Sequence, residues 1–119
     1  MLAAGVDMIE VKRVADVLER HGHRFADRVF TAGEMAYCAG QPERLAGRFA
    51  VKEAVAKAIG TGIGDITWTE IEIIRDERGK PHLVLHAAAQ QLAAAQGITE
   101  WAISISHTAT HAIGFAIGQ

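Results

Sequence analysis

The chain has 119 residues, of which 50% are hydrophobic and 22% are charged, and its formal net charge is −2 at pH 7. This length predicts one domain spanning residues 1–119, because it supports one hydrophobic core but is short for two. The composition is that of a globular protein and excludes a disordered or fibrous chain. The near-neutral charge argues against a general polyanion binder and predicts no nucleic-acid partner.

The cysteine content and the hydropathy pattern indicate neither export nor membrane insertion. Cys38 is the only cysteine, so no internal disulfide can form, and the expected role of this residue is that of a small buried hydrophobe. No run approaches the roughly 18 apolar residues that span a bilayer, and no signal-peptide pattern opens the chain. These features predict a cytoplasmic protein without a membrane partner.

The N-terminal residues predict a short strand followed by a helix. The apolar run after Met1 is expected to form a strand that Asp7 breaks. A helix is expected over residues 8–21, because Asp7 can cap its first turn and Glu10 stands at the third position of a capping box. Gly22 would end this helix.

The middle of the chain predicts further helices. Residues 24–37 indicate two short ones, with Thr31 and Glu34 as a capping box for the second. Residues 45–59 have the strongest helical pattern in the chain, and Gly60 ends it.

The C-terminal half alternates between strand and helix signals. Residues 66–86 are rich in β-formers around the turn sequence DERGK and predict a hairpin. An alanine-rich helix follows and ends at Gly97. Residues 101–118 alternate again around the turn HTATH and predict a second hairpin. The expected fold class is therefore α+β: an N-terminal strand, helices, and two β-hairpins with a helix between them.

The helix predicted over residues 45–59 carries charges opposite a face of small apolar residues. At about 100° per residue, Glu53 and Lys57 lie together on the polar side. Alone they fit an exposed ion pair that contributes about 0.2–0.5 kcal/mol. The run GTGIG after the helix adds alternate glycines, including Gly60 and Gly62, which allow close approach of a ligand and offer amide donors to phosphate oxygens. The pattern excludes a Walker loop and a Rossmann turn.

Three polar residues of the chain suit phosphate and metal chemistry. The carboxylates of Asp7 and Glu53 suit Mg²⁺, which takes one or two carboxylates together with water and phosphate oxygens. His107 closes a predicted strand at a turn, where its ring nitrogens can serve a phosphate. Sequence alone leaves the plainer alternatives open, in which Asp7 only caps a helix and His107 has no role beyond the turn.

Taken together, these motifs resemble a known family. GVDMIEVKR, GRFAVKEAVAKAIGTGIG, GKP and ISISHT occur in the order seen in holo-acyl-carrier-protein synthases, the small stand-alone 4′-phosphopantetheinyl transferases. The resemblance covers nearly the whole chain. It implies an α+β domain that assembles as a homotrimer, with coenzyme A bound between adjacent subunits.

The resemblance also implies a reaction and a reacting centre. The phosphopantetheine arm would move from coenzyme A to a serine of an apo acyl carrier protein, so the nucleophile belongs to the partner. Asp7 and Glu53 would hold Mg²⁺, and Lys57 would lie near the pyrophosphate, which makes these three the expected catalytic residues. The general base could be Glu53, Asp7 or a metal-bound water.

Further positions match family roles in substrate binding. Arg13 and Arg24 match positions that grip an acidic carrier helix. The positions expected to contact coenzyme A are Arg48, Lys57, Gly60, Gly62, Pro81 and His107.

Two other functional classes are alternatives for this chain. The chain could be a non-catalytic oligomeric module that binds a carrier protein or a nucleotide, although intact Asp7, Glu53 and Lys57 argue against this. An RNA-binding domain that uses GTGIG as a clamp would need basic residues beside the glycines and exposed aromatic side chains. In this chain the acidic residue Asp65 follows the glycines, and aromatic residues are few.

Overall fold

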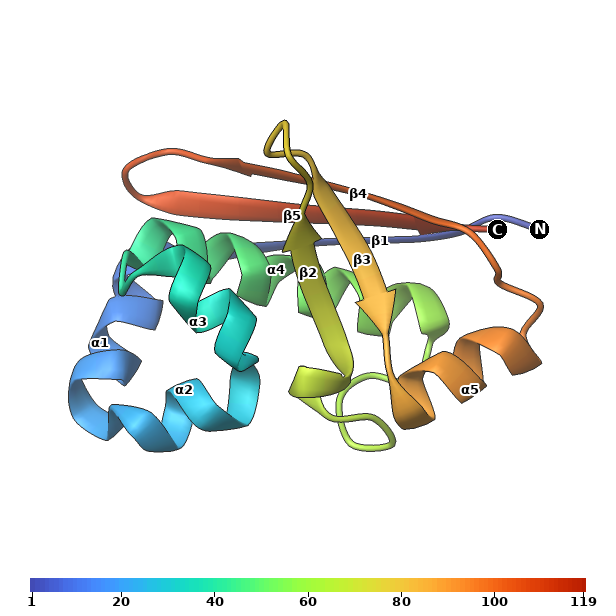
Figure 1. Ribbon diagram of the computed structural model, residues 1–119, viewed down its shortest axis with the longest axis horizontal. Helices are drawn as coiled ribbons and strands as arrows, with labels where there is room; N and C mark the ends of the chain where they lie inside the picture. The colour runs from blue at the N-terminus through green and yellow to red at the C-terminus, as the bar shows by residue number, and fades with distance from the viewer.

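One long helix, α4 (Pro42–Ile59), runs between two separate β-structures (Figure 1). The computed structural model describes residues 1–119 and has the expected α+β class. On one side of α4 lies a three-stranded antiparallel sheet in the order β1-β5-β4, formed by β1 (Ala3–Glu10), β5 (His111–Gly118) and β4 (Trp101–His107). On another side lies the hairpin of β2 (Ile71–Arg75) and β3 (Pro81–Leu85).

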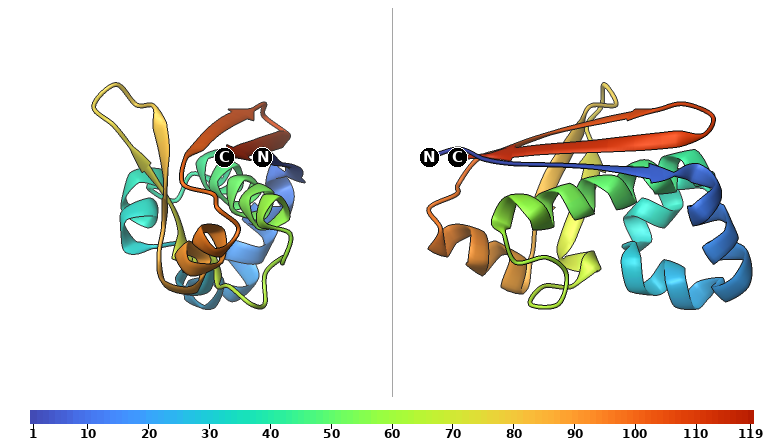
Figure 2. Two further views of the ribbon diagram at one scale, coloured as in Figure 1. Left: turned by 90° about the vertical axis from the view of Figure 1, so that its right-hand side faces the viewer. Right: turned by 180° about the vertical axis from the view of Figure 1, so that it is seen from behind.

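The remaining helices cover the two ends of α4 (Figures 1 and 2). Three short helices gather at one end: α1 (Val11–His21), α2 (His23–Val29) and α3 (Ala32–Cys38). At the other end lies α5 (Ala87–Ala95), and a 3-10 turn (Trp68–Glu70) precedes β2. None of the helices combines the length and the hydrophobicity that a membrane span requires.

Two glycines let the backbone of α4 lie directly on the sheet. A Cβ atom on Gly5 of β1 would lie 1.9 Å from the carbonyl oxygen of Ala54, and one on Gly114 of β5 would lie 2.3 Å from the amide nitrogen of Val51. Real Cβ atoms do not approach backbone atoms this closely, so only glycine fits at either position. The absence of a side chain at these two positions fixes the distance between α4 and the sheet within narrow limits.

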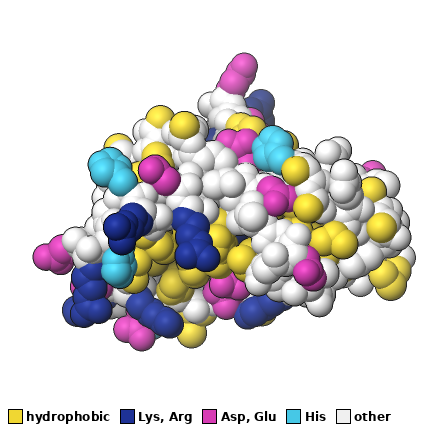
Figure 3. Space-filling view, turned by 90° about the horizontal axis from the view of Figure 1, so that it is seen from below, with side chains coloured by type: hydrophobic (Ala, Val, Ile, Leu, Met, Phe, Trp, Pro, Cys, Tyr) yellow, Lys and Arg dark blue, Asp and Glu magenta, His cyan; other side chains and the backbone are white.

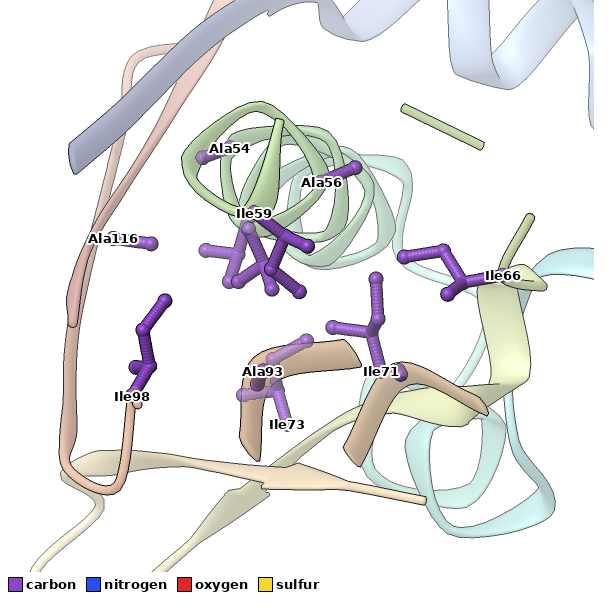
Figure 4. Close-up of a cluster of buried hydrophobic side chains, with 12 residues drawn as sticks. Ala54, Ala56, Ile59, Ile66, Ile71, Ile73, Ala93, Ile98 and Ala116 are labelled. Carbon is purple, nitrogen blue, oxygen red and sulfur yellow. The ribbon is translucent and has the colours of Figure 1, made fainter. Parts of the chain in front are cut away.

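Two buried clusters share α4. In the larger one, isoleucines from α4, β2 and the connecting loops converge (Figure 4). Its labelled members are Ala54, Ala56, Ile59, Ile66, Ile71, Ile73, Ala93, Ile98 and Ala116. The smaller cluster lies under α1–α3 and consists of Val11, Val14, Val29, Phe30, Cys38, Leu45, Ala46 and Ala112. Cys38 is fully buried, as the sequence predicts for a small hydrophobe.

A buried ion pair links α3, α4 and β2. The ammonium of Lys52 lies 2.8 Å from Glu34 Oε1, and both side chains are inaccessible to solvent. Lys52 also donates to the carbonyl oxygens of Trp68 and Ile71, while Glu34 Oε2 accepts a hydrogen bond of 3.0 Å from the amide of Ile73. Burial lowers the pKa of Lys52, and the adjacent carboxylate opposes that shift. Because every partner is satisfied, the pair holds the middle of α4 in register with the hairpin.

The predicted start of the first helix is wrong. β1 continues through Glu10, and α1 begins at Val11 with no side-chain cap on its first turn. Asp7 lies within the strand, opposite Gly114 of β5, and therefore does not cap a helix. Pairing along all of β1 outweighs a local capping signal, because each residue of the strand gains a ladder partner.

Most other predicted elements are confirmed, with shifted boundaries. Gly22 ends α1, and Thr31 with Glu34 forms the predicted capping box of α3. α4 begins at Pro42 rather than at residue 45, because proline is well suited to a first helical turn. The first hairpin begins at Ile71, and the residues before it form the 3-10 turn instead of strand.

Candidate active site

A cleft of about 360 Å³ opens where β1 leads into α1. Its walls come from four elements that are distant in the sequence: β1, α1, α2 and α4. The lining residues are Asp7, Met8, Ile9, Arg13, Val14, Val17, Phe25, Phe49 and Glu53. The cleft therefore combines a mostly apolar wall with two carboxylates and one guanidinium, which is the usual composition of a small-molecule site.

The ammonium of Lys57 binds two oxygens of β1. It lies 2.9 Å from Asp7 Oδ1 and donates a hydrogen bond of 3.1 Å to the carbonyl oxygen of Val6. The Lys57 side chain is 53% exposed and the Asp7 side chain 22%. Lys57 projects from α4 one turn after Glu53, so β1 and α4 bring all three charged groups to the same edge of the cleft.

Glu53 lies in an unfavourable electrostatic position for a carboxylate. Burial raises the pKa of Glu53, the nearby charge of Asp7 raises it further, and Lys57 only partly offsets these effects. No hydrogen bond contributes to its ionised form. The ammonium of Lys57 forms its ion pair with Asp7, which leaves Glu53 without an ion-pair partner beside a second acid.

The donor set at this edge fits a hard cation. Two carboxylates on separate rigid elements provide the oxygen ligands that Mg²⁺ prefers, and water and substrate phosphates normally complete its octahedron. The chain offers no cluster of three or more His, Cys, Asp and Glu that would hold a metal by itself. A site with only two protein ligands suits a metal that binds together with a phosphate substrate.

The two arginines expected to bind the carrier protein differ in their position relative to the cleft. Arg13 of α1 lines the cleft, whereas Arg24 of α2 is exposed and does not. Figure 3 shows Lys and Arg side chains on the half of the molecule that α1 and α2 occupy, with hydrophobic side chains exposed between them. Acidic side chains lie among them, so this half of the surface carries charges of both signs together with exposed hydrophobic groups.

His107 lies in a second, separate cleft of about 530 Å³ at the β4–β5 turn. Its lining residues are Gln41, Glu43, Arg44, His107, Thr108 and Ala109. The two clefts share no residue. Within one chain, His107 is therefore not brought to the site of Asp7 and Glu53.

Arg48 is buried and lies one helical turn after Arg44, which lines this second cleft. Its Nη1 donates a hydrogen bond of 3.2 Å to the carbonyl oxygen of Arg44, and its guanidinium carbon lies 4.5 Å from the ring centre of Tyr37. Arg44 and Arg75 lie over the same ring, at 5.2 Å and 5.0 Å. Burial lowers the pKa of Arg48, and its Nε has no partner. No carboxylate pairs with these three arginines, so positive charge accumulates around the tyrosine.

The remaining predicted positions lie on the surface of other elements. Gly60 and Gly62 have φ values of 89° and 70°, which favour glycine, and they turn the chain out of α4. Pro81 begins β3 in the hairpin. Neither the two glycines nor Pro81 lines the cleft of Asp7 and Glu53.

Comparison with known proteins decides the family. The model of the 4′-phosphopantetheinyl transferase superfamily matches residues 3–115. The chain belongs to this superfamily. It is a phosphopantetheinyl transferase, and the resemblance seen in the sequence motifs is confirmed.

Individual relatives support the same assignment. The holo-[acyl-carrier-protein] synthase of Herpetosiphon aurantiacus is 46% identical over 126 residues, which cover 100% of this chain and 99% of that protein. The synthase of Helicobacter pylori in complex with coenzyme A superposes with a TM-score of 0.90 at 27% identity, covering 98% of this chain and 99% of that one. For the synthase of Neisseria meningitidis the TM-score is 0.88 at 34% identity, with coverage of 98% and 97%.

Sequence reasoning missed several residues of the transferase that line or flank its clefts. Phe25 and Phe49 form part of the apolar wall, but their helical spacing is also that of ordinary core residues. Arg44 precedes Arg48 by four positions on the same helix, and this spacing was a usable signal for a basic cluster. Tyr37 and Arg75 join that cluster only through the tertiary fold.

Proposed function

We propose that this transferase carries out its reaction at the cleft of Asp7, Glu53 and Lys57. The protein moves the 4′-phosphopantetheine arm of coenzyme A to a serine hydroxyl of an apo acyl carrier protein. The observation that carries the assignment of the site is the meeting of two carboxylates, from β1 and α4, with one lysine that binds the first of them.

Asp7 and Glu53 are the residues that would hold Mg²⁺. When bound, the ion would neutralise charge on the diphosphate of coenzyme A and stabilise the leaving bisphosphate. The fit rests on hard oxygen donors, on the unmatched negative charge at Glu53 and on the space left for phosphate oxygens.

The protein side chains have separate tasks. Lys57 offers a mobile ammonium to the diphosphate, and Arg13 adds a second positive group to the cleft wall. Of the two carboxylates, Glu53 is the better acceptor for the serine proton, because burial and Asp7 raise its pKa while Asp7 is engaged by Lys57. The rigid seat of α4 on the sheet keeps these groups aligned.

The surface of α1 and α2 is proposed to bind the carrier protein. Arg13 of α1 and Arg24 of α2 are both exposed and would pair with an acidic helix of the partner. Such pairs mainly raise the association rate and the specificity. The adjoining cleft would then receive the arm together with the serine.

The nucleotide end of coenzyme A is proposed to bind at the second cleft of a neighbouring subunit. His107 and Arg44 line that cleft, and Arg48, one helical turn after Arg44, adds a positive charge that no carboxylate pairs with. Pro81 of the hairpin would contact the adenine, and the amides after Gly60 and Gly62 would face the phosphates. Because the two clefts share no residue, a substrate that uses both favours an assembly of more than one chain.

We propose that the assembly is a homotrimer closed through the outer face of the sheet. Val6, Met8, Ile113 and Phe115 point outward and are between 40% and 63% exposed. They pair across the strands, Val6 with Phe115 and Met8 with Ile113, so they form one continuous apolar patch. Patches of this kind on a surface mark protein interfaces.

Mass spectrometry of the carrier protein tests the reaction and the site. The protein is incubated with coenzyme A, Mg²⁺ and an apo carrier protein, and addition of phosphopantetheine to the carrier is followed with time. Glu53→Gln should slow the transfer by about 100-fold or more, whereas Glu77→Gln, the same change in an exposed turn, should leave it unaltered. A Glu53→Gln enzyme that works at the normal rate would refute the assigned site.

A further inference from the structure

The side chain of Lys57 already places a positive charge against Asp7. Its ammonium contacts one carboxylate oxygen and one backbone carbonyl oxygen of β1, at 2.9 Å and 3.1 Å. Carboxylate and carbonyl oxygens are also the ligands that hard metal ions take. The ammonium therefore already satisfies part of the oxygen set on the strand side of the site.

The opposite side of the site has no such partner. Glu53 lies on α4 one turn before Lys57, and its carboxylate gains no hydrogen bond. A divalent ion between Asp7 and Glu53 would relieve this charge, but it would also lie close to the ammonium on Asp7. Two cations on one carboxylate repel each other, so the metal and the Lys57–Asp7 pair oppose each other.

We propose that Lys57 is an internal placeholder for the divalent ion: it holds Asp7 in the empty enzyme and moves to the diphosphate when metal and coenzyme A bind. This inference rests on the proposed function of the same cleft. Lys57 is suited to the movement because its side chain is half exposed and its four-carbon stem is flexible. The diphosphate supplies the negative charge that draws the ammonium away.

The exchange has a thermodynamic consequence. The metal must displace Lys57 when it binds alone, but not when the diphosphate has already drawn the lysine away. Coenzyme A should therefore strengthen metal binding, and the metal should strengthen coenzyme A binding by the same factor. In this scheme the empty enzyme keeps little metal and loads it together with the substrate.

Metal binding to the full-length protein without coenzyme A tests the exchange. Mn²⁺ serves as a probe with similar oxygen preference, and the free ion is measured by its electron paramagnetic resonance signal. Lys57→Met should bind Mn²⁺ about fivefold more tightly than the wild type, which corresponds to the roughly 1 kcal/mol of an exposed ion pair. Lys57→Arg, which keeps the charge, should bind it as weakly as the wild type.

Two controls separate a local effect from a general one. Lys80→Met removes the same charge from the hairpin turn and should leave Mn²⁺ affinity unchanged. Asp7→Asn should abolish the binding. The placeholder role would be overturned if Lys57→Met bound Mn²⁺ no more tightly than the wild type, or if neither protein bound it. Weaker binding by Lys57→Met would show that the lysine only orients Asp7, because a lysine in that role strengthens the metal site.

A second titration, with saturating coenzyme A, tests the coupling. The affinity of the wild type for Mn²⁺ should rise by a larger factor than that of Lys57→Met, and equal factors would contradict the exchange. The transfer assay reports separately on the proposed function. A lack of transfer with tighter Mn²⁺ binding by Lys57→Met would refute the function alone, whereas normal transfer with unchanged affinity would refute the placeholder alone.

Discussion

The substitution Gly114→Ala tests whether the close contact between α4 and the sheet positions the active site. The new Cβ would lie 2.3 Å from the amide nitrogen of Val51 and 2.4 Å from the carbonyl carbon of Ala50. Since non-bonded heavy atoms pack at about 3.5 Å, α4 must move by about 1 Å. Glu53 follows Val51 by two residues, so the movement shifts one carboxylate relative to the other.

Both the stability and the rate should fall. Overpacking of a core costs about 1–3 kcal/mol, and at about 4 °C per kcal/mol for a chain of this size the melting temperature should drop by about 4–12 °C. A displacement of about 1 Å at a reacting centre costs about 100-fold in rate. Scanning calorimetry at fixed protein concentration and the mass-spectrometric transfer assay measure the two effects.

Gly33→Ala provides the matched control. Gly33 lies in the first turn of α3, and a Cβ there would lie at ordinary contact distance from two side-chain oxygens, 3.6 Å from Glu72 Oε2 and 3.9 Å from Thr31 Oγ1. The same substitution should raise stability by about 0.5–1 kcal/mol, because alanine loses less entropy in a helix than glycine. If Gly114→Ala melts like the wild type and keeps its transfer rate, the contact between helix and sheet does not position the site.

Three further predictions follow from other contacts. Lys52→Met should lower the free energy of unfolding, measured in urea, by about 3–5 kcal/mol, because it leaves the carboxylate of Glu34 buried without a partner. Adding Glu34→Gln should restore part of this stability. An unchanged free energy of unfolding in Lys52→Met would refute the stabilising role of the pair. In metal-free buffer Glu53→Gln should be more stable than the wild type at neutral pH but not below pH 4.5, the ordinary pKa of glutamate. The raised pKa of Glu53 gives the wild type stability that is present below that value and is lost as pH rises through the folded-state pKa. A difference in unfolding free energy between the two proteins that stays the same at all pH values, measured in urea, would contradict this. Phe115→Glu should yield monomers in light scattering, whereas Ile74→Glu, on the exposed hairpin, should not; unchanged mass for Phe115→Glu would exclude the proposed interface.

The fold signals that the sequence predicted correctly are local ones. The capping box of Thr31 and Glu34 and the end of α1 at Gly22 depend on residues a few positions apart, and both occur in the structure. The start of α1 depends instead on pairing between β1 and the last strand of the chain. No local pattern in the sequence indicates that pairing. The helix cap predicted at Asp7 therefore does not form, because the residue pairs with β5 as part of strand β1.

In the active site, too, the residues with a local or motif signal were predicted, and those brought together only by tertiary packing were not. Asp7, Glu53 and Lys57 were singled out by residue type and by family motifs, and the fold brings all three to one cleft edge. The apolar wall that includes Phe25 and the stack of arginines on Tyr37 are products of packing between distant segments. Spacing along one helix does not reveal which side chains from another helix will face it.

Almost every face of helix α4 contacts another part of the protein or carries a residue of the active site. One side lies against the sheet, another fills both hydrophobic clusters, the Lys52 side is tied to the hairpin, and the outward turn holds Glu53 and Lys57. An engineer who wishes to retarget this enzyme to another carrier should therefore leave residues 45–59 and Arg13 untouched and diversify the other exposed positions of α1 and α2. Substitutions there alter the docking surface without disturbing the part of the chain on which folding and chemistry jointly depend.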